Sequence, residues 1–158
     1  MKLEDKLEIL LRNYIDDHDL EVNVHVDLTG EWQYDFDSRI VNVTIQNDED
    51  ANYCMKKLCD ELGLNWNCPM FLISLLHEIG HDQTIYNFTI DEWILPTFYC
   101  KLKSMMCEEA VENDYMIYMR SPRELIATKW AVQYANEEKD SLRALWSEII
   151  ELFEEYVI

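Results

Sequence analysis

Glycine and proline are scarce in this chain, with three of each among 158 residues. Because these residue types interrupt helices and shape tight loops, their scarcity favours long helices and few elaborate loops. Long apolar runs are missing as well, since no stretch reaches the roughly 20 residues of a membrane-spanning helix. We therefore expect no membrane partner.

Positive charge is also scarce. Thirteen lysines and arginines stand against 32 aspartates and glutamates, so the net charge is −19. A surface of this sign repels nucleic-acid phosphates and anionic membranes, so we expect no direct nucleic-acid binding. Two interpretations of the acids remain: they keep the chain soluble, or they make it a decoy that mimics DNA and occupies a basic protein.

Cysteine offers no disulfide framework and no zinc-ribbon pattern. The count is odd, no CxxC pair occurs, and the positions are Cys54, Cys59, Cys68, Cys100 and Cys107. The N-terminus "MKLEDKLEIL" is an amphipathic acidic segment that lacks the features of a signal peptide. These features predict a cytoplasmic protein with reduced thiols.

Hydrophobic periodicity predicts one α+β domain over residues 1–158, mostly helical with a small antiparallel sheet. Apolar spacing predicts helices at 3–17, 47–63, 68–82, 97–119, 122–136 and 140–156. Alternation predicts strands at 21–26, 32–36 and 39–45, whose apolar faces are Val22, Val24, Val26, Val41, Val43 and Ile45. Ser121 before Pro122 is typical of a helix start, with serine as the cap and proline at the first helical position.

The segment "LLHEIGH" contains the HExxH pattern of zinc peptidases. On a helix, His77 and His81 lie on one face and can bind one ion, while Glu78 can reach a metal-bound water. Gly80 lowers helix stability by about 1 kcal/mol relative to alanine, which indicates that another backbone passes close by. The alternative is a core helix whose histidines make ordinary hydrogen bonds.

A catalytic zinc needs a third protein ligand. The extended pattern HExxHxxGxxH is excluded, because positions 84 and 87 are Thr84 and Asn87. Glu124 is the preferred candidate, since alanines one and two turns later on its face would let its helix pack closely against the motif helix. The other candidates are Glu108, Glu109, Glu112, Asp91, Glu92, His18 and His25.

Charge that develops on a substrate carbonyl needs a hydrogen-bond donor besides the metal. Tyr115, Tyr118 and Tyr134 are candidates, and Tyr134 is preferred because it shares the helical face of Glu124. Asp82 directly follows His81, where it can orient a ligand histidine or simply end the helix.

"LLHEIGH" followed by "ELIATKWA" resembles the paired motifs of the ImmA/IrrE-like metallopeptidases, especially the small ones carried by phages and prophages. The resemblance implies a compact zincin fold of the glutamate-ligand kind. It also implies one Zn²⁺ at His77, His81 and Glu124, with Glu78 as general base. Members of that family tend to cut a transcriptional repressor, so the implied partner is a protein or peptide substrate. The chain departs from the family in the helix predicted at 47–63, where a shorter link is expected.

The sequence thus predicts a zinc-dependent metallopeptidase that hydrolyses a peptide bond. The alternative is a non-enzymatic acidic binding protein, which either keeps the zincin fold or acts as the DNA-mimicking decoy. Glu78 distinguishes the two, because a binding protein needs no general base beside a metal ligand.

Overall fold

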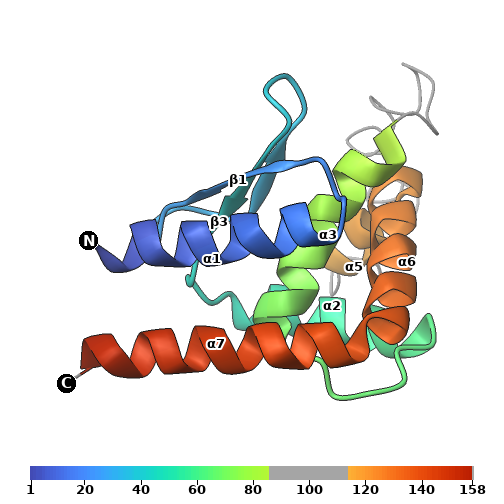
Figure 1. The fold of residues 1–158 in the computed structure, drawn as a ribbon. Coiled ribbons are helices and arrows are strands. Elements are labelled where there is room, and N and C mark those ends of the chain that lie inside the picture. The colour runs from blue at the N-terminus through green and yellow to red at the C-terminus, as the bar shows by residue number, and fades with distance from the viewer. Residues whose placement is uncertain (86–113, 158) are drawn as a thin grey trace.

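A computed structural model of the protein describes residues 1–85 and 114–157. Over these residues the fold is α+β and mostly helical, with one three-stranded sheet (Figure 1). The elements follow in the order α1 (Leu3–Asp17), β1 (Asn23–Val26), β2 (Gln33–Asp35), β3 (Ile40–Val43), α2 (Glu49–Glu61), α3 (Met70–Thr84), α5 (Asp114–Met119), α6 (Pro122–Glu137) and α7 (Lys139–Val157). No helix in the described residues is long and apolar enough to cross a membrane.

Five predicted helices are confirmed as α1, α2, α3, α6 and α7, with ends within two residues of the expected ones. The start of α2 is set by Asp48, whose carboxylate accepts a hydrogen bond from the Ala51 backbone N–H at 3.0 Å. The chain leaves α2 through Gly63, which has a φ of 96° that favours glycine. Of the helix predicted at 97–119, α5 covers the end, and residues 97–113 lie outside the described residues.

Ser121 occupies the cap position before α6, and Pro122 is at the start of the helix, as predicted. The serine hydroxyl, however, donates to the Tyr118 carbonyl at 2.6 Å and makes no capping bond to α6. Ser121 therefore ties the end of α5 to the start of α6.

The sheet is mixed, so the prediction of an antiparallel sheet is wrong. Its order is β1-β3-β2, with β3 parallel to β1 and antiparallel to β2. After β1 the chain leaves the central position of the sheet empty and forms β2 at the far edge. The apolar β3 then fills the centre, between β1 and β2. Gln33 and Asp35 are exposed on β2, which suits an edge strand. The predicted apolar faces of β1 and β3 are buried, except that Ile45 lies beyond β3 and is 45% exposed.

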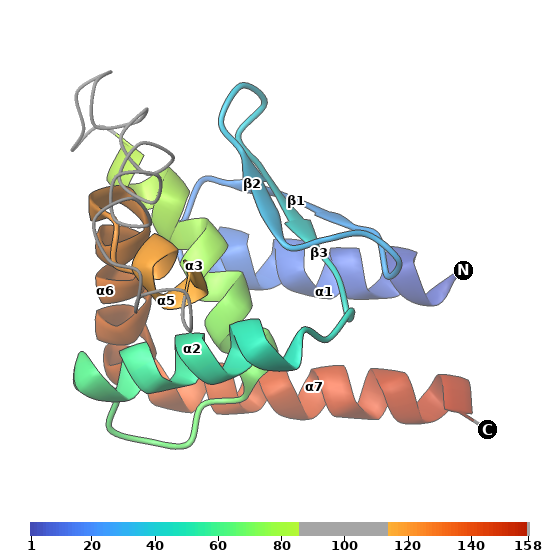
Figure 2. The ribbon, with the colours of Figure 1, turned by 180° about the vertical axis from the view of Figure 1, so that it is seen from behind.

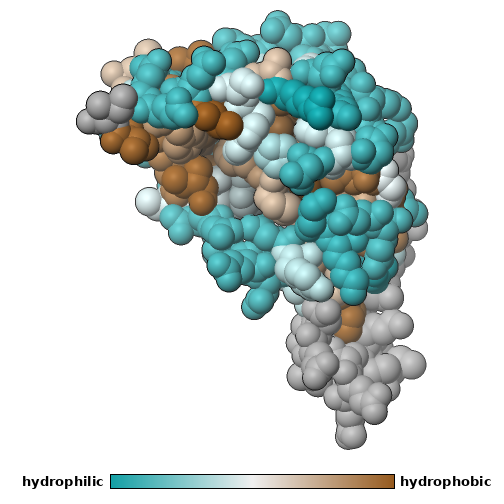
Figure 3. Space-filling view, turned by 90° about the horizontal axis from the view of Figure 1, so that it is seen from below, coloured by the Kyte–Doolittle hydropathy of each residue, from teal (hydrophilic) through white to brown (hydrophobic). Residues whose placement is uncertain are grey.

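The helices pack around one hydrophobic core that draws residues from α1 through α7. α1 lies between β1 and α7 and runs antiparallel to α7 (Figure 1). The termini are close together, since the Tyr156 hydroxyl donates to the Met1 carbonyl at 2.6 Å. The face that carries α7 is mostly hydrophilic, with hydrophobic residues toward the termini, where Ile150 and Val157 are exposed (Figure 3).

α3 and α6 approach each other closely at Gly80. A Cβ atom on Gly80 would lie 2.5 Å from the backbone carbonyl oxygen of Ala127. Ala127 and Ala131 are both buried, 0% and 3% exposed. The structure confirms the prediction that another backbone passes Gly80, and it identifies that backbone as α6.

Candidate metal centre

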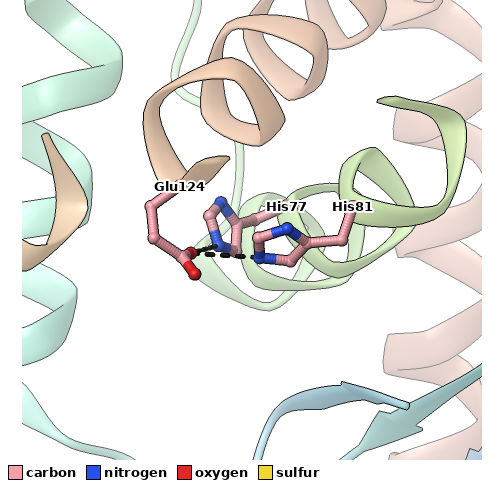
Figure 4. A group of neighbouring side chains, drawn as sticks. All are labelled: His77, His81 and Glu124. Carbon is pink, nitrogen blue, oxygen red and sulfur yellow. Dashed lines mark hydrogen bonds and ion pairs between the residues drawn. The ribbon is translucent and has the colours of Figure 1, made fainter. Parts of the chain in front are cut away.

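α3 and α6 bring two imidazoles and one carboxylate together. His77 and His81 stand one turn apart on α3, and Glu124 lies in the first turn of α6. The Glu124 Oε2 atom is 2.9 Å from His77 Nε2 and 3.0 Å from His81 Nε2, so the carboxylate points at both rings (Figure 4). All three side chains are buried, and one potential ligand atom from each lies within 4.8 Å of the others. The group could bind a metal ion.

The hydrogen bonds of Thr128 decide which nitrogen of His77 faces the centre. The Thr128 hydroxyl donates its one proton to the Glu124 carbonyl at 2.9 Å. It must therefore accept from His77 Nδ1, which is 3.0 Å away and carries the ring proton. With Nδ1 donating to Thr128, Nε2 faces Glu124 as a lone pair in neutral His77 and as a second N–H donor in protonated His77.

This arrangement calls for a cation. A lone pair and a carboxylate oxygen 2.9 Å apart repel each other unless a proton or a metal ion lies between them. Zinc ligands lie about 2.0–2.2 Å from the ion, so nitrogen and oxygen ligands of a tetrahedral site stand about 3.3 Å apart. The observed spacing is a few tenths of an ångström shorter, and small side-chain movements would admit the ion. The residues therefore fit zinc.

The His81 ring is held by aromatic neighbours. It stacks near Tyr34 with 6.3 Å between ring centroids, and Phe36 packs edge-on at 5.7 Å. His81 Nδ1 is buried and has no hydrogen-bond partner within residues 1–85 and 114–157. The two imidazole rings are thus oriented differently, His77 by a hydroxyl and His81 by packing.

Burial and pairing shift the pKa values of the centre. Burial opposes charge on His77, but its hydrogen bond to Glu124 and the charge of Glu78 raise its pKa above 6.5. Burial alone would raise the pKa of Glu124, and the hydrogen bonds from both imidazoles outweigh it and hold that pKa well below its usual range. Burial raises the pKa of Glu78, partly offset by the two histidines. Shifts of this kind are typical of functional sites.

A cavity of about 580 Å³ opens beside His77, His81 and Glu124, and Glu78 also lines it. One wall is the edge strand β2 with the residues next to it, and the other comes from α2 and α5. α2 runs across the front below the sheet in Figure 2. The backbone N–H of Tyr34 on β2 faces Glu78 and lowers the pKa of its carboxyl slightly. The carboxylate predicted as general base therefore lies beside His77, His81 and Glu124 and faces the edge strand β2.

Tyr118 supplies the tyrosine hydroxyl of this centre. It donates to Glu124 Oε1 at 2.9 Å and lines the cavity together with Tyr115. Tyr134, the preferred candidate, is placed elsewhere: its hydroxyl lies 3.2 Å from that of Tyr14, and its ring stacks on Trp130. Tyr134 does not line the cavity among the described residues. We therefore replace Tyr134 with Tyr118 as the candidate donor.

The other candidate ligands are not brought to the centre. His18 stacks on Tyr14 at 4.0 Å between ring centroids, and exposed His25 lies 3.3 Å from Glu8. Asp82 contacts neither ligand ring through a hydrogen bond and instead pairs with the sheet. The remaining candidates, Glu108, Glu109, Glu112, Asp91 and Glu92, lie outside the described residues.

Sequence reasoning missed Thr128 and underrated Tyr118. Thr128 follows Glu124 by four residues, so the helical spacing of "ELIAT" already places its hydroxyl one turn from the ligand carboxylate. No comparable pattern singles out Tyr118, because it reaches Glu124 from the end of α5.

The described residues thus define an α+β protein with a buried His-His-Glu group that could bind a metal ion. No protein-family model matches the chain, and no curated protein or solved structure matches it. The family resemblance of the two motifs stays a prediction, and the case for a function rests on the site itself.

Proposed function

We propose that the chain is a zinc-dependent metallopeptidase with a compact zincin-like fold, similar to the ImmA/IrrE-like proteins. His77, His81 and Glu124 hold one Zn²⁺, and Glu78 is the general base. The observation that carries the proposal is the buried ligand group beside a cavity that also contains Glu78. Three protein ligands leave a fourth zinc position open, as in catalytic rather than structural zinc sites.

Each side chain has a role that follows from its chemistry. Bound zinc supplies a Lewis acid that polarises a carbonyl oxygen and lowers the pKa of water to about 7. The Glu78 carboxylate takes a proton from the attacking water and delivers it to the leaving amine. The Tyr118 hydroxyl, which donates to Glu124 in the free protein, would donate instead to the oxygen on which negative charge develops.

A protein or peptide segment is the substrate class that suits the cavity. β2 is an edge strand, and its outer side meets no other strand within the described residues. An extended peptide could add to that edge by backbone hydrogen bonding and place a peptide bond beside Glu78. A transcriptional repressor is the specific partner that the family resemblance implies.

Metal analysis of the purified protein tests the ligand set. We expect one zinc per chain in the wild type and none in Glu124→Ala. Glu137→Ala is the matched control, because it removes an exposed carboxylate from the same helix. Glu109→Ala, which tests the alternative ligand, should keep the metal. A wild-type protein that holds no zinc after reconstitution would refute the proposal.

Cleavage is tested separately, with candidate repressors and a peptide library as substrates. Glu78→Gln should bind zinc like the wild type and cut about 10²–10⁴-fold more slowly, the usual contribution of a general base. A zinc-loaded wild type that binds basic proteins tightly and cuts none would favour the acidic binding protein instead.

A further inference from the structure

Asp82 is a buried carboxylate that the proposed chemistry does not use. Its side chain is 0% exposed, although it directly follows the ligand His81. A buried charge is costly unless it is paired and hydrogen-bonded. The Tyr34 hydroxyl donates to Asp82 Oδ1 at 2.5 Å, and Arg39 donates from Nε at 2.8 Å and from Nη2 at 3.1 Å. Asp82 thus joins α3 to the sheet.

Tyr34 contacts α3 at two points one turn apart. Its hydroxyl donates to Asp82, while its backbone N–H faces Glu78, with which it lines the cavity. Glu78 and Asp82 each directly follow a ligand histidine, so Tyr34 spans the turn of α3 that carries both ligands. Its side chain is buried, and its ring also packs near His81.

Arg39 completes the arrangement from the turn between β2 and β3. Its φ of 54° is a left-handed backbone conformation, which is uncommon in non-glycine residues and is stabilised by contacts of the side chain. The two-pronged bond to Asp82 is a contact of that kind, and it fixes the hairpin on the same carboxylate as Tyr34. Two residues of one hairpin therefore converge on one buried charge.

We propose that Tyr34, Asp82 and Arg39 form a latch, a set of hydrogen bonds that fixes the edge strand β2 relative to α3. The latch thereby fixes the distance between β2 and Glu78 with the proposed metal ligands. Tyr34 and Asp82 are positioning residues, because they act through β2 and Glu78 and need not touch the substrate. The part of the inference that concerns substrate rests on the proposed function. The latch itself is a statement about β2 and is measurable without any substrate.

Amide hydrogen exchange tests the latch directly. Tyr34→Phe removes only the hydroxyl, and we expect the amides of residues 32–36 to exchange at least about tenfold faster, since a hydrogen bond to a charged group is lost. Tyr14→Phe is the matched control. Its hydroxyl is also part-buried, 3.0 Å from Ser141 Oγ, but it bonds between helices away from the cavity. It should leave exchange at residues 32–36 unchanged.

A second measurement separates positioning from general stability. Tyr34→Phe should bind Zn²⁺ and acetohydroxamate within about threefold of the wild type, yet bind a peptidyl hydroxamate about tenfold more weakly, because only the peptide pairs with β2. Tyr14→Phe should change none of the three affinities. A parallel loss for both hydroxamates would show that Tyr34 serves the metal site itself and overturn the latch.

Unchanged exchange at residues 32–36 in Tyr34→Phe, or equal acceleration in Tyr14→Phe, would also overturn the proposal. If Tyr34→Phe does not fold, Arg39→Lys replaces it in the exchange experiment, because Arg39 is half-exposed and tolerates substitution better. Lysine keeps the charge but loses the fork geometry, so exchange in the same segment should again rise; no rise overturns the latch. Failure of the proposed function would instead appear as a wild-type protein that binds no zinc. The hydrogen-exchange result does not depend on zinc, so the two failures can be told apart.

Discussion

Gly80→Ala tests the close approach of α3 and α6 on which the metal centre depends. In most helices this change is stabilising, since alanine favours the helix by about 1 kcal/mol over glycine. Here the new Cβ would lie 2.5 Å from the Ala127 carbonyl oxygen and 3.2 Å from the Ala127 carbonyl carbon. These are backbone atoms of Ala127, which is fully buried, so they cannot rotate away as a side chain would.

The two effects can be weighed. Overpacking a well-packed interior costs about 1–3 kcal/mol, and a backbone contact belongs in the upper part of that range. After the gain of about 1 kcal/mol in helix propensity, we expect Gly80→Ala to lower the free energy of unfolding by about 1–2 kcal/mol. For a chain of this size that lowers the melting temperature by roughly 2–8 °C. Glu124 lies one turn before Ala127, so separating the helices should also weaken zinc binding by about tenfold.

Thermal and urea unfolding of the metal-free protein measure the first effect, and zinc titration measures the second. Ala144→Gly, at an exposed position of α7, is the control that reports the alanine–glycine difference where no other backbone approaches. It should cost about 1 kcal/mol. If Gly80→Ala instead raised the melting temperature and left zinc affinity unchanged, the close approach of the two helices would be wrong.

Three further predictions concern single side chains. Thr128→Val should weaken zinc binding about 10–100-fold by removing the hydroxyl that orients a ligand ring, whereas Thr128→Ser should keep most of the affinity. Burial raises the pKa of the Cys59 and Cys68 thiols to about 12, so both remain protonated at pH 8. Mass spectrometry should find neither modified by a thiol reagent at that pH until the protein unfolds. Glu31 lines the cavity, so Glu31→Gln should weaken binding of a lysine-containing peptide to the zinc-loaded protein about two- to fivefold at low salt, while Glu137→Gln, with the same change in net charge, should have less effect.

Predictions that depended on local spacing were accurate. The helical repeat of "LEDKLEILLRNYI" gave α1 with its buried face, and HExxH placed His77 and His81 on one side of α3. The destabilising Gly80 within a helix correctly indicated a neighbouring backbone. In each case the information lay within one or two helical turns, the range over which side-chain spacing determines contact.

Predictions that required distant segments to be placed in space were less accurate. The prediction of an antiparallel sheet failed because alternation shows which residues share a face, but not which strands are neighbours or in which direction they run. Tyr134 shares a helical face with Glu124, but ten residues along a helix correspond to about 15 Å, too far to serve the same ion. Tyr118 reaches Glu124 from another helix, and no spacing rule connects the two.

The pairing of α3 with α6 explains why "ELIATKWA" strengthens the prediction of a metal site made from "LLHEIGH". His77, Gly80 and His81 stand at positions i, i+3 and i+4 of one helix, and so lie on one face.

Glu124, Ala127 and Thr128 have the same spacing on the other helix. The two faces meet residue against residue: the carboxylate meets both imidazoles, Ala127 meets the glycine, and the threonine hydroxyl meets the first imidazole.

Each contact depends on the others. The threonine can turn the ring only if the helices are close, and they are close only because the glycine has no side chain. A chance HExxH helix has no reason to face such a partner. This matching of two faces, more than the presence of two histidines, is the physical ground for expecting a metal ion between them.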